Sequence, residues 1–105
     1  YFSFKPPAFK KKKLKIAIVF LHEAYRFEVW LAAANKRVQE KYWKMIQESR
    51  WEQYSLVLST SGADAILEHT LVENPNFGDL EQLTEKIEAK TLSFIRDIEA
   101  FLIKV

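Results

Sequence analysis

The chain has 105 residues, of which 49% are apolar, and a formal net charge of +2. This size and composition suit one compact domain. The chain has no cysteine and only two glycines, which excludes disulfide-stapled and collagen-like classes and suits the reducing cytoplasm. The longest uncharged apolar run, residues 16–21, is too short for a membrane span or a signal-peptide core. We therefore expect a cytoplasmic protein with no membrane partner.

The charge is unevenly distributed along the chain. Residues 1–50 hold twelve Lys and Arg against four Asp and Glu, whereas residues 51–105 hold four against ten. Such a split fits either a basic face for an anionic partner or two halves that attract each other in the folded protein.

The amino-terminal residues predict a short strand over residues 1–5, because aromatic and polar residues alternate there. Pro6 and Pro7 end this strand, since proline fixes the backbone and lacks a donor. We expect a loop from there through Lys10 to Lys13.

The next segment predicts an antiparallel hairpin followed by a helix. Apolar residues on both faces favour a central strand at 14–22, and strict alternation favours a second strand at 26–33. The expected loop between them is residues 23–25. Asn35 lies where a helix cap should be, ahead of apolar residues at helical spacing.

The second half predicts another hairpin and a long helix. A β-rich run at 54–59 and a loosely alternating run at 65–72 flank the turn residues Ser61 and Gly62. A short helix over residues 64–70 fits the second run as well, so both alternatives stay open.

Asp79, with Gln82 three residues later, has the layout of a capping box and predicts a helix from there to the end of the chain. The resulting order is strand, strand, strand, helix, strand, strand, helix. It indicates an α+β fold, with a mostly antiparallel sheet and helices packed mainly on one face.

Four stretches carry a family resemblance: LKIAIVF at 14–20, RFEVWLAA at 26–33, KYW at 41–43, and GADAILEH followed by LVENPNF between 62 and 77. Over nearly its whole length the chain resembles a family of small, uncharacterised bacterial proteins, a domain of unknown function. The resemblance implies an extra helical segment before the first strand, so we expect residues 1–105 to be a single α+β domain lacking that segment. It implies no activity and no catalytic residue.

The first hairpin offers a candidate ligand site. With a loop at 23–25, His22 lies opposite Arg26, and His22, Arg26, Glu28 and Trp30 line one surface. A histidine beside a glutamate can act as acid or base, and an arginine can clamp an anion. The plainer interpretation is a structural cross-strand ion pair. His69 is a further candidate, although a hydrogen-bonded core histidine is the plainer interpretation.

A second candidate site is the lysine run Lys10, Lys11, Lys12 and Lys13, which could neutralise the phosphates of a nucleic acid. A solvated loop is the plainer interpretation, since no nucleic-acid-binding signature accompanies the run. No residue spacing typical of a metal site, a thiol nucleophile or a phosphate-binding loop occurs, so we expect no cofactor and no metal.

The composition favours a non-enzymatic protein-binding or assembly domain. Fifteen aromatic residues exceed what so small a core readily hides, and aromatic residues are enriched at interfaces. The partner would be another protein or a second copy of the chain. A small-ligand-binding protein or enzyme with the pocket at His22, Arg26, Glu28 and Trp30, and a nucleic-acid-binding module, remain the alternatives.

Overall fold

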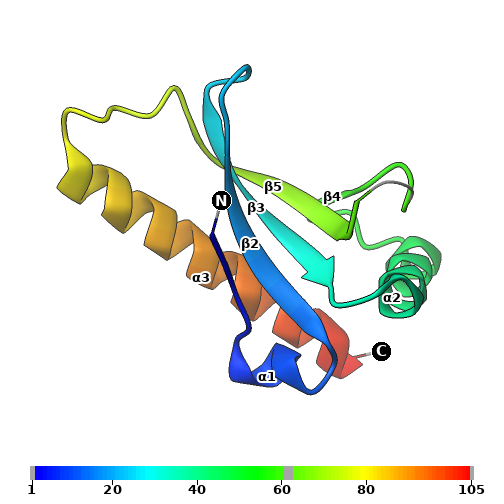
Figure 1. Ribbon diagram of the computed structural model, residues 1–105. Coiled ribbons are helices and arrows are strands. Elements are labelled where there is room, and N and C mark those ends of the chain that lie inside the picture. The colour runs from blue at the N-terminus through cyan, green and yellow to red at the C-terminus, as the bar shows by residue number, and fades with distance from the viewer. Residues whose placement is uncertain (1, 61–62, 105) are drawn as a thin grey trace.

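The computed structural model describes residues 2–60 and 63–104, and its fold is α+β (Figure 1). All strand pairs are antiparallel, and the five strands lie in the order β1-β2-β3-β5-β4. The predicted fold class is therefore confirmed. The elements are β1 (Phe2–Phe4), α1 (Pro7–Lys10), β2 (Leu14–Leu21), β3 (Arg26–Ala33), α2 (Lys36–Ser49), β4 (Ser55–Leu56), β5 (Ala65–Glu73) and α3 (Leu80–Lys104).

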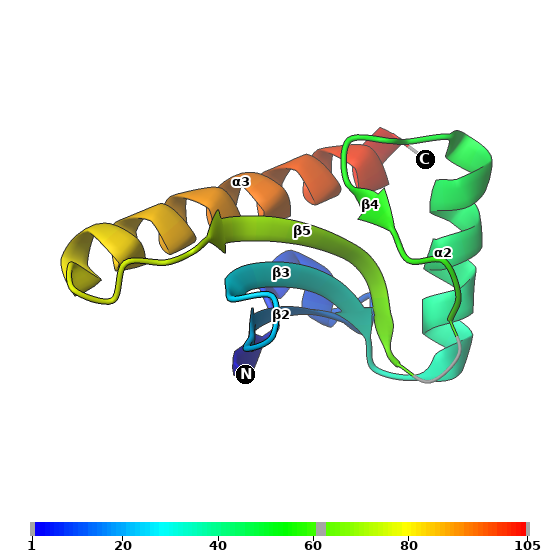
Figure 2. The same cartoon turned by 90° about the horizontal axis from the view of Figure 1, so that it is seen from above.

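The long helix α3 covers one face of the sheet, and α2 crosses the end of the sheet beside β4 (Figure 2). In the described part of the chain no helix covers the opposite face, which we call the open face. Because side chains alternate along a strand, the strand pairing assigns to the open face Lys15, Ala17, Val19, Leu21, Arg26, Glu28, Trp30, Ala32, Glu68 and Thr70.

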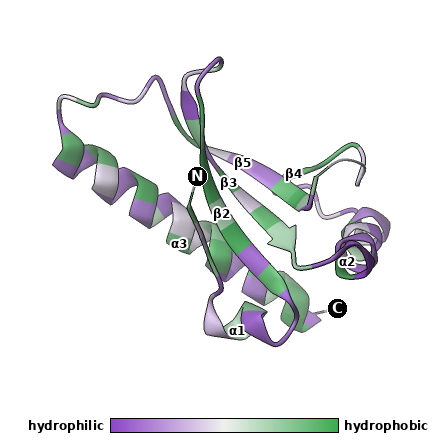
Figure 3. Ribbon diagram, in the orientation of Figure 1, coloured by the Kyte–Doolittle hydropathy of each residue, from purple (hydrophilic) through white to green (hydrophobic). Residues whose placement is uncertain are grey.

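The hydrophobic core lies between the sheet and α3. Val29 and Leu31 of β3 are buried against Phe94 and Ile98 of α3, and the fully buried Phe9 of α1 joins the same cluster. The apolar and polar stripes of α3 that this packing requires are visible in Figure 3. Full burial of one such side chain contributes about 1.5–3 kcal/mol, so the α3 face is the main source of stability.

Both predicted helix caps are present. Asn35 Oδ1 accepts a hydrogen bond from the Val38 amide at 3.0 Å, and Asp79 Oδ1 accepts one from the Gln82 amide at 3.1 Å. Each side chain thereby satisfies one of the free amides at a helix start, which explains why α2 and α3 begin where they do. None of the helices in residues 2–60 and 63–104 is long and apolar enough to span a membrane.

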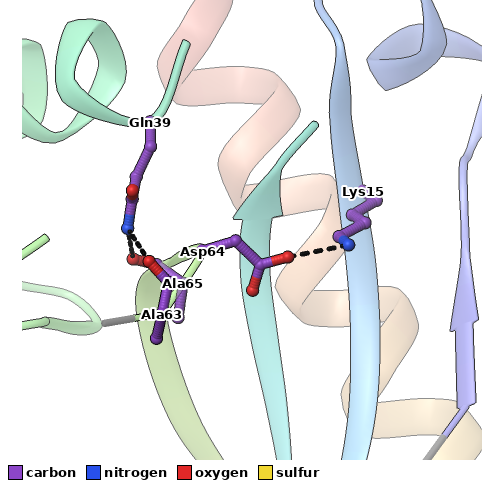
Figure 4. A network of polar contacts seen from close by, with 5 residues as sticks. All are labelled: Lys15, Gln39, Ala63, Asp64 and Ala65. Carbon is purple, nitrogen blue, oxygen red and sulfur yellow. Dashed lines mark hydrogen bonds and ion pairs between the residues drawn. The ribbon is translucent and has the colours of Figure 1, made fainter. Parts of the chain in front are cut away.

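Helix α2 is fastened to the start of β5 by a buried glutamine. The Gln39 side chain is 1% exposed, and its Nε2 donates to the carbonyl oxygens of Ala63 and Ala65, both at 2.9 Å (Figure 4). On the open face nearby, the Lys15 ammonium lies 2.8 Å from the Asp64 carboxylate, across the intervening strand β3 (Figure 4). These contacts fix the end of the sheet where β2 begins and β3 ends.

Three details of the prediction need correction or completion. Residues 7–10 form the short helix α1 instead of a loop, because the fixed dihedral of Pro7 suits the first helical position. Residues 65–73 form a strand, so the short-helix alternative over 64–70 is wrong. The second hairpin is confirmed, but β4 keeps only two residues, and its expected turn at Ser61 and Gly62 lies outside the described residues.

Candidate functional site

The register of the first hairpin decides which side chains meet on the open face. Leu21 pairs with Arg26 and Val19 pairs with Glu28. The turn is therefore four residues long, from His22 to Tyr25, and the prediction that His22 lies opposite Arg26 is wrong. A difference of one residue transfers a side chain to the other face of the sheet.

The cause of this register is the backbone of Tyr25. Its φ of 50° lies in the left-handed region, and its carbonyl oxygen accepts a hydrogen bond from the Asn74 amide at 3.0 Å. The loop after β5 thus holds the turn in place. His22 packs edge-on to Phe20, with ring centroids 4.8 Å apart. It belongs to an aromatic cluster on the α3 side of the sheet, formed with Phe20, Tyr25, Phe27 and Phe77.

The other three predicted residues do share one surface. Glu28 is only 6% exposed, although it lies on the open face, which no helix of the described residues covers. Its Oε2 accepts a hydrogen bond from Arg26 Nε at 2.6 Å, and its Oε1 accepts one from Trp30 Nε1 at 2.8 Å. Residues two apart on a strand point to the same side, so this cluster is built within β3 alone. The ion pair therefore joins residues of one strand, and the expected cross-strand pair is corrected.

These two hydrogen bonds compensate for the burial of the Glu28 carboxylate. A buried carboxylate is tolerated only when it is paired and hydrogen-bonded, and charge-assisted bonds are the strong ones. Each carboxylate oxygen of Glu28 accepts one hydrogen bond, so Glu28, Arg26 and Trp30 stabilise one another within β3.

Glu68 is the residue that sequence reasoning did not place in this site. It pairs with Trp30 across the sheet, and Thr70 pairs with Glu28, so Glu68 stands beside the buried carboxylate. Burial raises the pKa of Glu68, the charge of Glu28 raises it further, and the charge of Arg26 opposes both. The missing information was the pairing of β3 with β5, which no local pattern states.

Together these side chains border a shallow cup of about 300 Å³. Its lining is Arg26, Glu28, Ser55, Glu68, His69 and Thr70. Two carboxylates face one guanidinium, so the cup has more acceptors than donors and suits a cationic, hydrogen-bond-donating group. No group of three His, Asp or Glu residues arranged to hold a metal ion occurs in residues 2–60 and 63–104.

His69 borders the cup, but its ring packs on the α3 side. It lies edge-on to Tyr54, with centroids 4.7 Å apart, and parallel to Phe94 at 6.1 Å. Burial lowers its pKa, and the charge of Lys90 lowers it further. Both effects favour the neutral imidazole, which packs among aromatic rings on the side of the sheet opposite the cup.

The lysine run lies elsewhere. Lys10 ends α1, and Lys11 to Lys13 form the exposed turn before β2, at the end of the sheet where β3 ends. The cup lies near the start of β3. The two candidate sites of the sequence are thus separate surfaces.

No curated protein and no solved structure matches the chain. A family model described as a domain of unknown function (DUF7000) matches residues 1–102, in agreement with the resemblance carried by the strand and helix segments. Since the match covers nearly the whole sequence, the chain belongs to the DUF7000 family.

Proposed function

We propose that this is a non-enzymatic protein-binding domain, and that its open face receives a basic side chain of a partner protein in the cup beside Glu68. The observation that carries the proposal is the excess of carboxylate: Glu68 stands next to the buried Glu28, and Arg26 is the one cation of the lining. A lysine or arginine of the partner would restore the balance.

The free acceptor of the cup is Glu68. Both oxygens of Glu28 already accept hydrogen bonds from Arg26 and Trp30. No hydrogen bond or ion pair joins the Glu68 carboxylate to another of the described residues. An incoming ammonium or guanidinium group would therefore bond to Glu68 and also feel the nearby charge of Glu28.

The surroundings of the cup favour a protein over a small molecule. Pockets for small ligands enclose most of the ligand surface, whereas this cup is shallow and lies on an uncovered sheet. Val19, Leu21 and Trp30 lie half-buried on the same face. Tryptophan and arginine within a mixed apolar and polar surface are typical anchors of protein interfaces.

The alternative, an enzyme with its active site on this surface, would lack an acid-base residue, because His22 lies elsewhere. That hypothesis needs His22 beside Glu28, and the register places His22 on the other face, against Phe20. The remaining lining offers no hydrogen-bonded pair of nucleophile and base, which acyl or group transfer would require.

The test uses the indole N–H of Trp30 as a reporter in a ¹⁵N NMR spectrum. The probe is Nα-acetyl-lysine methylamide, which carries the ammonium group of a partner lysine. We expect a saturable shift of the Trp30 indole signal, because its acceptor Glu28 lines the cup. The Trp43 indole, which donates to the Val57 carbonyl at 2.8 Å, is the internal control and should stay in place.

Two variants separate specific binding from general charge attraction. Glu68→Gln should abolish the shift, while Glu85→Gln, an exposed change of equal charge on α3, should leave it intact. Equal shifts in both variants, or no saturable shift in the wild-type protein, would refute the proposal. If butylammonium binds as tightly as the lysine probe, the site binds simple alkylammonium ions. The proposal of a protein partner would then be refuted.

A further inference from the structure

The four lysines lie at the end of α1 and in the turn that follows it, and backbone hydrogen bonds hold this segment in place. The Lys12 amide donates to the Phe9 carbonyl at 3.0 Å, and the Lys13 amide donates to the Lys10 carbonyl at 3.2 Å. Phe9 before the turn and Leu14 after it are both fully buried. The exposed lysines are therefore presented from a fixed backbone, which reduces the entropy lost on binding.

A backbone hydrogen bond joins this turn to the start of α2. The Ala34 amide donates to the Lys13 carbonyl at 2.9 Å, two residues before the helix begins. On α2, Arg37, Lys41 and Lys44 recur at helical spacing and are exposed, on the side opposite the buried residues of that helix. Most of α2 is accordingly purple in Figure 3. We call Lys10, Lys11, Lys12, Lys13, Arg37, Lys41 and Lys44 the basic patch.

The basic patch has little compensating negative charge. Residues 10–15 and 34–49 contain nine Lys and Arg against two acidic residues, Glu40 and Glu48. The carboxylate of Asp64 at this end of the sheet is engaged by Lys15 at 2.8 Å. No ion pair joins the basic patch to an acidic side chain of the described residues.

The first turn of α2 shows the same imbalance. It has no acidic residue, and it begins with Lys36 and Arg37. Cations at the amino end of a helix oppose the helix dipole, which favours acidic residues there. The fold thus concentrates positive charge at a position where local stability favours the opposite sign, and such conflicts are expected at functional surfaces.

We infer that the basic patch binds the phosphate backbone of double-stranded nucleic acid. Its charges are spread over two adjoining segments, as contact with several successive phosphates requires. Binding of single strands relies on stacking of bases on exposed aromatic rings. Here Tyr42 is 7% exposed and Trp43 is partly buried against the core, so α2 presents no fully exposed ring. Recognition should therefore be independent of base sequence.

The experiment is fluorescence anisotropy of a labelled DNA duplex at several salt concentrations. Contact with about five phosphates predicts a slope of about −4.5 in a plot of log affinity against log salt concentration. The variant Lys11→Glu/Lys12→Glu should weaken binding at least tenfold at low salt, and removal of two contacts should reduce the slope by about 2. The control Lys86→Glu/Arg96→Glu carries the same charge change on exposed positions of α3 and should bind nearly as the wild type does.

Circular dichroism establishes that each variant is folded before binding is compared. An equal loss of DNA affinity in both double variants would show an effect of net charge alone and would overturn the inference. So would tighter binding of the matching single strand, or binding to phosphatidylserine vesicles without binding to the duplex. The open-face cup takes no part in this experiment, so its outcome is independent of the proposed function.

Discussion

Glu68 stands beside Glu28 on the uncovered face of the sheet, and the charge of Glu28 is one of the causes that raise the pKa of Glu68. The other and larger cause is burial. Glu28 itself is satisfied by Arg26 and Trp30 within its own strand. The Glu28 carboxylate is thus already hydrogen-bonded, whereas the Glu68 carboxylate can accept a hydrogen bond from a partner. This difference is the chemical basis of the proposed binding of a basic side chain.

The first prediction concerns Glu68→Gln and pH. Below the ordinary pKa of 4.5 the carboxyl is protonated in both the folded and the unfolded chain, so the variant and the wild type should be equally stable. As pH rises through the window between 4.5 and the raised pKa, the unfolded chain loses its proton first and the folded wild type is penalised. The variant should therefore be more stable at pH 7, by less than about 1 kcal/mol because the group is partly solvated.

Urea unfolding at pH 4 and pH 7 measures this difference. Glu85→Gln on the exposed surface of α3 is the control for the loss of one negative charge. A stability gain for Glu68→Gln that is equal at both pH values would contradict the account.

The second prediction concerns the donor Trp30. Trp30→Phe removes the indole N–H and leaves Oε1 of the buried Glu28 without its partner at 2.8 Å. An unsatisfied buried acceptor costs about 1–3 kcal/mol, more when it is charged, so the free energy of unfolding should fall by at least that amount.

A double-mutant cycle with Glu28→Gln isolates the pair. The loss caused by Trp30→Phe should be smaller in the Glu28→Gln background, because the acceptor is then uncharged. Strictly additive losses would mean that the indole contributes packing alone.

The third prediction concerns the contact between Tyr54 and Asp97. The Tyr54 hydroxyl donates to Asp97 Oδ2. Burial, this hydrogen bond and the charge of Asp97 raise the pKa of Tyr54 to about 12. In the unfolded chain it ionises near 10, so stability is lost as pH rises from 10 through about 12.

Tyr54→Phe should remove that alkaline loss, and its tyrosinate absorbance curve should lack a component near pH 12. Thermal unfolding between pH 9 and 12 and an ultraviolet titration measure the two effects. A Tyr54 component near 10 in the wild type would refute the assigned environment.

The fourth prediction concerns Arg50, which ends α2 with a φ of 55° and donates its amide to the Gln47 carbonyl at 3.2 Å. This left-handed position favours glycine, so Arg50→Gly should raise the free energy of unfolding by about 0.5–1 kcal/mol. Arg96→Gly, inside α3, should lower it by about 1 kcal/mol. If urea unfolding shows a lower free energy of unfolding for both variants, the Arg50 side chain contributes more to stability than relief of its backbone conformation does.

Much of the fold could be predicted from the sequence because local patterns determine it. Alternation over residues 26–33 gave β3 with its observed bounds and placed Arg26, Glu28 and Trp30 on one side. The side chains of Asn35 and Asp79 gave both helix starts, since a cap is a local hydrogen bond.

The errors in the candidate site arose where contacts distant in the sequence decide the structure. The hairpin register depends on Tyr25 in a left-handed conformation, held by the amide of Asn74, and no glycine marks that position. The role of Glu68 depends on β5 pairing with β3. The four-residue turn moved His22 out of the candidate site, and the strand order brought Glu68 into it.

The most direct measurement of the proposed function is an NMR titration of the Glu68 carboxyl carbon, with and without saturating Nα-acetyl-lysine methylamide. In the free protein its pKa should lie above 4.5, and the bound ammonium should lower it, because a neighbouring cation favours the ionised carboxylate. A Glu68 pKa that is unchanged by the probe would contradict the claim that this face binds a basic side chain.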